Sequence, residues 1–337
     1  GLDNLVQLSS PDTGLTNYTH DNAGNRVIQN DARRVTTIYG YDALNRLRSV
    51  TFPDTTLDLG FDYDSVPGSC DAGEQAAVGR LSRFTDATGS TEFCYEPRGN
   101  LTRKTQETGG VTLTVRYAWT TAGRLQSITY PSGNTLRFER DAEGRVQRMF
   151  AAVSGNAEAE LVSAVNYLPF GPVAGITWNN PNAVYARGVE GTPTSLQQTR
   201  SYDQNYWIDR IEPSLAEGLQ ADFTLDVVGN ISAIAGAGGA PVNGYSYDDL
   251  YRLTSESAPA LSLAHAYDAT GNRTAETVAG ATTVYAYPPD SHRLTNIGGT
   301  ERTFDAAGNL RVLNRGTRSS PEYAYDDRNR LAAFRVG

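Results

Sequence analysis

The sequence is poor in the residues that build metal sites and catalytic nucleophiles. It has two cysteines, three histidines and one methionine among 337 residues. The histidines, His20, His265 and His292, are scattered, so no cysteine and histidine cluster has metal-ligand spacing. No nucleophile-elbow pattern is present, and a hydrolytic triad therefore has little support. We expect no metal, no cofactor and no enzymatic activity.

Basic runs and long apolar runs are missing as well. The formal net charge is −9, from 29 Lys and Arg against 38 Asp and Glu, which disfavours a nucleic-acid partner. No apolar run approaches the roughly 20 residues that a membrane span needs, and residues 1–10 lack the features of a signal peptide. We expect no membrane span, and we expect the chain to start at the cut end of something longer.

What the sequence does have is a repeated frame, seen in the stretch YDATGNRT from Tyr267 to Thr274. We number this frame from its acidic residue, so that Asp268 is position 1 and Gly271 is position 4. Copies recur about every 21 residues, which indicates a repeat architecture. Ten copies have their position 1 at Asp21, Asp42, Glu96, Thr120, Asp141, Asp226, Asp248, Asp268, Asp305 and Asp326.

The frame predicts a tight turn. Asp at the first position of a type I turn accepts hydrogen bonds from backbone N–H groups ahead of it, and position 4 can then be left-handed, as in a G1 bulge. That slot favours glycine or asparagine. Its occupants are Gly24, Asn45, Gly99, Gly123, Gly144, Gly229, Tyr251, Gly271, Gly308 and Asn329, of which only Tyr251 breaks the rule.

Each repeat is expected to be one β-hairpin. An aromatic-x-aromatic pattern precedes many turns, as in Tyr39 to Tyr41 and Tyr245 to Tyr247, and period two is typical of a strand. Roughly 30 strands at about 4.8 Å each would make a flat sheet about 140 Å wide, and accumulated twist prevents such a sheet. The predicted fold is all-β: tandem hairpins in one long coiled antiparallel sheet, a spiral or barrel-like wall. We expect it to cover residues 1–337 without a clear internal boundary.

A loop insertion is expected at residues 65–79, and it leaves two questions open. Cys70 and Cys94 are about one repeat apart, so they could form a disulfide contributing roughly 3 kcal/mol, or they could be two unpaired small apolar side chains. Four acidic residues gather near the loop and suggest calcium. Their spacing differs from that of an EF-hand, and a solvated loop is the favoured interpretation. These residues are Asp62, Asp64, Asp71 and Glu74.

The frame, its period and the segment from Tyr167 to Gly171 resemble the Rhs, or YD-repeat, proteins, a group that includes bacterial polymorphic toxins and teneurins. The resemblance implies a β-sheet cocoon, part of a secreted or surface-delivered protein, that encloses a toxic C-terminal domain or serves contact between cells. The partners implied are the remainder of a larger protein and its toxin or cargo. Autoproteolysis cannot be carried over, because no Asp-Pro or Gly-Arg pair follows Asp326.

Two classes of function remain. A structural shell would use the repeated aspartates for turns and the aromatic residues for cross-strand ladders, with no catalytic residue. An adhesion or carbohydrate-binding surface would instead present the aromatic face to a cell-surface receptor or glycan. The ladder interpretation is favoured because buried or half-buried tyrosines are most often packing residues.

Overall fold

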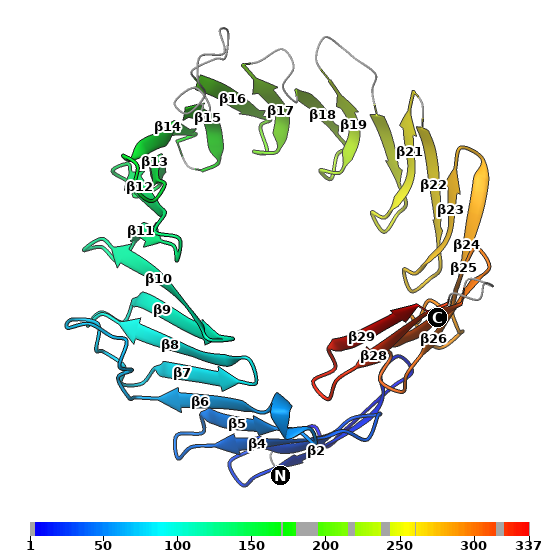
Figure 1. Ribbon diagram of the computed structural model, residues 1–337. Helices are drawn as coiled ribbons and strands as arrows, with labels where there is room; N and C mark the ends of the chain where they lie inside the picture. Colours follow the sequence, from blue (N-terminus) through cyan, green and yellow to red (C-terminus); the bar gives the residue numbers. More distant parts are fainter. Residues whose placement is uncertain are drawn as a thin grey trace. The chain divides into compact units, whose positions relative to one another are not determined.

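The computed structural model describes residues 4–169, 171–179, 195–214, 220–236, 243–259, 261–314 and 320–336. Phe170, in the segment from Tyr167 to Gly171, lies outside the described residues. The described residues form 29 strands and one short 3-10 helix, so the all-β prediction is confirmed. Every strand pairing whose register is described is antiparallel and joins neighbours in sequence, as in β4 with β5 and β8 with β9 (Figure 1). Within the described ranges, no helix is long and apolar enough to cross a membrane.

The chain divides into two compact units, each described here by itself. The first comprises Gly1–Leu113, Ala266–Glu276 and Thr282–Gly337. Its N-terminal part contains β1 (Gln7–Ser10), β2 (Gly14–His20), β3 (Arg26–Asn30), β4 (Thr36–Tyr41), β5 (Leu47–Thr51), η1 (Thr55–Leu57), β6 (Leu59–Tyr63), β7 (Leu81–Asp86), β8 (Gly89–Tyr95) and β9 (Leu101–Thr108). Its C-terminal part contains most of β23 (Arg273–Val278) and β24 (Ala281–Ala286), then β25 (Asn296–Ile297), β26 (Thr300–Phe304), β27 (Leu310–Asn314), β28 (Pro321–Tyr325) and β29 (Leu331–Val336).

The second unit comprises Thr114–His265 and Thr277–Ala281. Its strands are most of β10 (Val111–Trp119), then β11 (Leu125–Thr129), β12 (Thr135–Arg140), β13 (Val146–Ala152), β14 (Ala159–Tyr167), β15 (Val173–Asn179), β16 (Ser195–Tyr202), β17 (Ile208–Pro213), β18 (Ala221–Leu225), β19 (Ile231–Ala235), β20 (Asn243–Tyr247), β21 (Leu253–Ala258) and most of β22 (Leu261–Tyr267).

The described residues of neither unit form a large hydrophobic core. In the second unit, the buried side chains of the described residues are Val162 and Ala221. The first unit has Thr16, Thr37, Val50, Ala77, Ser82, Thr91, Cys94 and Arg103. Aromatic pairs across neighbouring strands also stabilise the sheet. The ring centroids of Phe61 and Phe84 are 5.3 Å apart. The hairpins are therefore held mainly by strand ladders, cross-strand contacts and turns.

Candidate functional site

The frame turns have the same hydrogen-bond pattern from copy to copy. In the second copy the Asp42 amide donates to the Arg46 carbonyl at 2.9 Å, and the Asn45 amide donates back to the Asp42 carbonyl at 3.0 Å. The strands then rejoin with a bulge, so that Tyr41 pairs with Leu47. This is the geometry of a three-residue loop closed by a G1 bulge.

The aspartate at position 1 organises each turn through both carboxylate oxygens. In the copy at Asp268, Oδ1 accepts the amides of Thr270 and Asn272 at 2.9 Å each. Oδ2 accepts the Asn272 side-chain amide at 2.8 Å. Where position 5 is arginine, its Nε replaces the amide, at 2.7 Å from Arg46 to Asp42 and from Arg252 to Asp248. The repeated carboxylates are thus occupied by their own turns.

Position 4 is left-handed in all ten copies, with φ between 60° and 95°. Tyr251, which breaks the residue preference, adopts φ 60° like the others. Position 4 therefore requires a left-handed backbone in every predicted copy. Most copies, but not all, have the glycine or asparagine that favours this conformation.

Three further turns on the frame edge were not predicted from the sequence, and the turns at Asp31 and Tyr130, on the opposite edge, close with the same hydrogen bonds. The Tyr202-Asp203 pair starts one of the three, in which the Asp203 amide donates to the Trp207 carbonyl at 2.8 Å. Leu168 starts another, closed by Gly171. The third is split: Asp64 is position 1 and Gly79 takes the left-handed place of position 4, so the insertion lies inside the turn. The signals were the Tyr-Asp pairs at 202 and 63, each followed by an unusual continuation.

In seven hairpins, the tyrosine before the turn binds its hairpin to the preceding one. The Tyr41 hydroxyl donates to the carbonyl of Arg26, which is position 6 of the previous copy, at 3.0 Å. The same bond joins Tyr63 to Leu47, Tyr95 to Leu81, Tyr167 to Val146, Tyr202 to Val173, Tyr247 to Ile231 and Tyr287 to Arg273. Arg140 takes this role in its copy, with Nη2 2.9 Å from the Leu125 carbonyl. These tyrosines bind the sheet itself through their polar ends.

Arginine at position 5 strengthens the same junction from the other side. The Arg46 guanidinium lies 4.4 Å from the ring centroid of Tyr63, and that of Arg145 lies 4.5 Å from the ring centroid of Tyr167. Cation–π contacts of this kind contribute about 0.5–1 kcal/mol at exposed sites. Each copy thus contacts the aromatic residue of the next.

In some copies position 5 also lies over position 4 of the next copy, whereas Arg252 leaves the space at Gly271 open. A Cβ on Gly144 would overlap the guanidinium of Arg124, and a Cβ on Gly229 would lie 2.9 Å from a ring carbon of Trp207. In the three predicted copies without glycine at position 4, the preceding copy has asparagine at position 5. These pairs are Asn25 with Asn45, Asn230 with Tyr251, and Asn309 with Asn329. The side-chain amide of Asn25 donates to that of Asn45 at 2.8 Å. A short residue at position 5 leaves room for a side chain at the next position 4.

This coupling predicts unequal costs for one substitution. Gly271 and Gly144 have φ 95° and 82°, but a Cβ meets nothing within 4 Å at Gly271. Gly271→Asn should therefore cost only a few tenths of a kcal/mol, whereas Gly144→Asn should cost about 1 kcal/mol more by displacing Arg124 from the Glu143 carbonyl. Adding Arg124→Asn should remove most of that difference. Denaturant unfolding of these three variants and of the unmodified protein measures the coupling, and equal midpoints for both glycine variants would contradict it.

The frame aspartates also predict how stability depends on pH. Hydrogen bonding by Asn272 lowers the pKa of Asp268 to about 2, from an ordinary value of 3.8. Hydrogen bonding by Arg46 likewise lowers the pKa of Asp64 to about 2. Because the folded-state pKa values are depressed, this stabilisation is present above pH 3.8 and is lost as pH falls through about 2.

We expect the thermal midpoint to be level above about pH 4 and to fall between pH 4 and pH 2. Asp268→Asn should lower the midpoint at pH 7 and make the acid decline shallower, because one depressed carboxylate is gone. A calorimetric pH series on both proteins tests this. An equally steep acid decline in the variant would show that Asp268 does not contribute to it.

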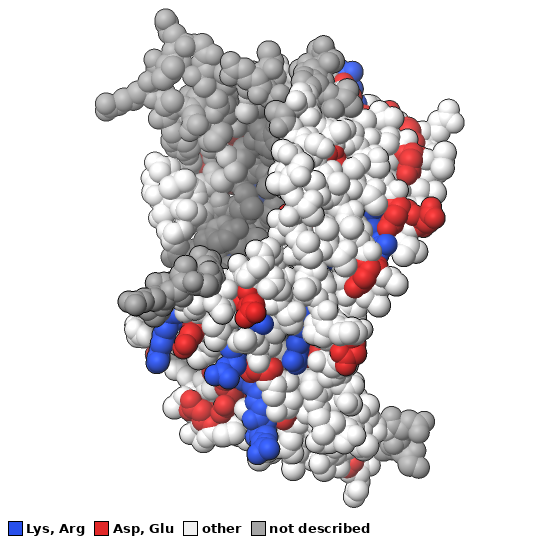
Figure 2. All heavy atoms as spheres, turned by 90° about the vertical axis from the view of Figure 1, so that its right-hand side faces the viewer, with Lys and Arg blue, Asp and Glu red and all other residues white. Residues whose placement is uncertain are grey.

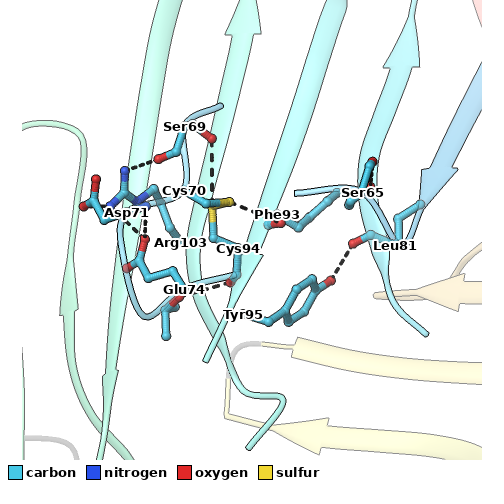
Figure 3. Close-up of a disulfide and its surroundings, with 12 residues drawn as sticks. Ser65, Ser69, Cys70, Asp71, Glu74, Leu81, Phe93, Cys94, Tyr95 and Arg103 are labelled. Atoms are coloured by element: carbon cyan, nitrogen blue, oxygen red, sulfur yellow. Dashed lines mark hydrogen bonds and ion pairs between the residues drawn. A yellow bond between two sulfur atoms is a disulfide. The ribbon is translucent and has the colours of Figure 1, made fainter. Parts of the chain in front are cut away.

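A disulfide joins Cys70 to Cys94 of β8, with 5.5 Å between their Cα atoms. It attaches the insertion to the sheet, as Figure 3 shows. Residues 64–80 contain no strand, and the loop packs on the sheet: Cys94 is 1% exposed, Ser82 is fully buried and Ala77 is 3% exposed. Most residues of the insertion are exposed, as expected of a solvated loop, and it is fixed to the sheet through Cys70 and the buried Ala77.

Arg103 of β9 holds the loop beside the disulfide (Figure 3). Its guanidinium donates to the Ser69 carbonyl and pairs with Asp71, and it lies 2.8 Å from a Glu74 carboxylate oxygen. Asp64 pairs with Arg46 at 2.6 Å and accepts the Gly79 amide. All four carboxylates suggested as a calcium loop are therefore paired with arginine, the fourth being Asp62, which lies 3.9 Å from Arg48. Within the described ranges, no group of three or more His, Cys, Asp or Glu is placed to hold a metal.

A model of the RHS repeat matches residues 95–135 and 119–149. The chain contains RHS repeats. The resemblance drawn from the Tyr-Asp frame is thereby confirmed, although no curated protein sequence matches the chain. In the matched RHS segment, the two turns at Glu96 and Thr120 have Glu and Thr in place of Asp. Apart from the turn that starts at Leu168, the other frame turns reproduce its geometry with the more usual aspartate.

Solved structures share the fold of this RHS chain. The crystal structure of TcdB2-TccC3 aligns with a TM-score of 0.75 and 16% identity over 98% of this chain. The complex TcdB2-TccC3-Cdc42 aligns with a TM-score of 0.74 and 16% identity over the same share. The Tc holotoxin pore of Photorhabdus luminescens gives 0.72 and 17%, again over 98%. The RHS chain spans about a fifth of the matched chains, 19–20% of their length.

Proposed function

We propose that this RHS segment is a non-catalytic part of a shell wall that encloses a toxin or cargo domain for delivery. The observation that carries the proposal is the use of the repeated functional groups. Frame aspartates bind their own turns, and frame tyrosines bind the preceding hairpin. Carboxylates and hydroxyls that could otherwise take part in catalysis or ligand binding instead form hydrogen bonds that join hairpins into a continuous sheet.

The fold supports the same role. The chain aligns over nearly its whole length with TcdB2-TccC3, although identity is only 16%. Its partners would be the remainder of a larger RHS protein and the enclosed domain. The Cys70–Cys94 disulfide fits a secreted or cell-surface location, because disulfides persist in oxidising compartments.

The face shown in Figure 2 disfavours a polyanionic partner. On the described part of the face in Figure 2, basic and acidic side chains lie side by side in the lower half without a continuous basic patch. Adhesion through the aromatic face is disfavoured as well, because many tyrosine hydroxyls donate to main-chain carbonyls.

The test is protease resistance of the cargo in the parent protein. With an intact wall, the cargo domain should resist digestion. In a Gly229→Val, Gly271→Val double variant, where a β-branched residue is forced into left-handed turns, it should become cleavable. The matched control is Val227→Thr with Ala269→Val, in the same two turns but at exposed positions outside the left-handed region. Cargo equally sensitive in all three proteins would exclude containment, and glycan binding by the isolated chain would then favour adhesion.

A further inference from the structure

The first unit brings together turns that lie almost the whole sequence apart. Two kinds of turn are involved. Frame turns contain the repeat frame, and back turns connect the opposite ends of the strands. The back turns concerned are 12–14, 31–34, 54–58 and 86–89. They lie against the turns at 291–293, 305–308 and 326–329, so that blue and red hairpins are neighbours in Figure 1. We call this line of contacts the seam.

Asp12 is the centre of one end of the seam. Its Oδ1 accepts the Ser291 hydroxyl at 2.6 Å and the His292 amide at 2.7 Å. Its carbonyl accepts Nε of Arg293 at 2.7 Å. One back-turn residue thus receives three hydrogen bonds from a segment about 280 residues further along the chain.

Two arginines form the other end. Arg33 donates to the carbonyls of Asp326 and Asp327, at 2.8 and 3.3 Å. Arg328 points the opposite way and donates Nε to the Leu57 carbonyl at 2.6 Å. Its side chain is only 10% exposed and lies 3.9 Å from Asp86. The Asp54 amide donates to the Asp327 carboxylate at 2.9 Å.

Glycine allows the backbones to approach along the seam. A Cβ on Gly308 would overlap the carbonyl oxygen of Asp12. A Cβ on Gly14 would lie 2.7 Å from the carbonyl oxygen of Ala306. A main-chain carbonyl cannot easily move aside, whereas the flexible end of an arginine side chain can. The seam therefore depends on close packing of turns as well as on side chains.

The seam differs in kind from the junctions between successive hairpins. Those junctions combine a strand ladder with tyrosine bonds, and removing them exposes many backbone groups. The described seam contacts come from turns and a few side chains, which makes the seam easier to separate. It joins a back edge to a frame edge, two surfaces that every hairpin of the repeat presents.

We propose that the seam is the line along which the wall opens and closes, while the hairpins on either side stay folded. The proposal rests on the containment function proposed above. In it, Asp12, Arg33 and Arg328 are closing residues. Asp12 and Arg33 of the back turns bind main-chain groups of His292 and Asp326, and Arg328 of a frame turn binds the main-chain carbonyl of Leu57 in a back turn. The partner that fits a back edge is thus a frame edge of the same repeat.

Hydrogen exchange of the isolated full chain tests the seam without any cargo. The amides of Asp54 and His292 report on the seam, because both donate to carboxylates across it. Gly24 and Gly229, whose amides close frame turns, report on the hairpins. Arg33→Ala with Arg328→Ala should speed exchange at the two seam amides on the order of tenfold and leave the hairpin amides unchanged.

A matched glycine pair separates the seam from backbone strain. Gly308→Ala and Gly271→Ala change the same frame position at φ 86° and 95°, but only the first places a Cβ against Asp12. Only Gly308→Ala should speed exchange of the seam amides. The proposal is overturned if both variants act alike, if seam exchange does not change, or if hairpin amides lose protection together with the seam.

The parent protein with cargo then links the seam to containment. Cargo should become protease-sensitive in Gly308→Ala and stay resistant in Gly271→Ala. Sensitivity in neither variant, with resistant wild-type cargo, would reject the seam as the opening line and leave containment standing. Sensitive cargo in the wild type would reject containment, and the exchange results would still report whether the seam separates alone.

Discussion

Replacing Cys70 and Cys94 together with serine should lower the free energy of unfolding by about 3 kcal/mol in the chain-entropy model. The bond closes a sequence separation of 24 residues, so its loss frees a long loop in the unfolded chain. The folded state loses packing too, because Cys94 is the most buried apolar residue of the described chain and serine leaves a hydroxyl there. Denaturant unfolding under non-reducing conditions measures the change.

Reductant provides the control for this prediction. It should lower the midpoint of the unmodified protein toward that of the double variant and leave the variant unchanged. Exchange should accelerate in residues 64–80 before it does so in β11–β13, because the loop is attached through this bond. A double variant as stable as the unmodified, oxidised protein would show that Arg103 alone fixes the loop.

The sequence was sufficient to predict the hairpin fold because its signals are local. An aspartate, a left-handed slot three residues later and alternating aromatics decide one turn and its two strands without distant information. The copy at Asp268 is an example, since the hydrogen bonds from its amides to the Asp268 carboxylate stay within five residues. The tyrosine ladders could be anticipated for the same reason. The hydroxyl acceptors could not, because they depend on strand register.

What the sequence could not supply depends on contacts distant along the chain. Gly308 was expected to be glycine for its left-handed turn, yet Asp12, nearly 300 residues earlier, also requires it. The insertion at residues 65–79 contains no periodic pattern, so its packing against Arg103 could not be inferred. The split frame at Asp64 was missed because its halves are separated by the insertion. Two expectations stay predictions. One is that the frame residues at positions 1 and 4 serve as structural turn residues of the shell, and the other is that residues 1–337 form one segment without a clear internal boundary.

Arg103→Ala should cost about 3 kcal/mol, because breaking a buried ion pair leaves its partners without compensation. The Arg103 side chain is 6% exposed and that of Glu74 is 19% exposed, so water cannot fully replace the guanidinium. The carbonyl of Ser69 loses a donor in the same change. Chemical denaturation at neutral pH, with the disulfide intact, measures the cost.

Two variants show whether burial is the cause. Arg137 pairs with Glu139 and Glu158 but is 31% exposed, so Arg137→Ala should cost less than about 1 kcal/mol. Arg103→Lys should recover only part of the loss, since one ammonium cannot reproduce the planar fork that reaches Ser69, Asp71 and Glu74 together. Similar costs for Arg103→Ala and Arg137→Ala would mean that the loop is held by the disulfide and that the buried arginine only fills space. A large cost at Arg103 alone would make this side chain, with the disulfide, the reason why an insertion inside a frame turn leaves the hairpin intact.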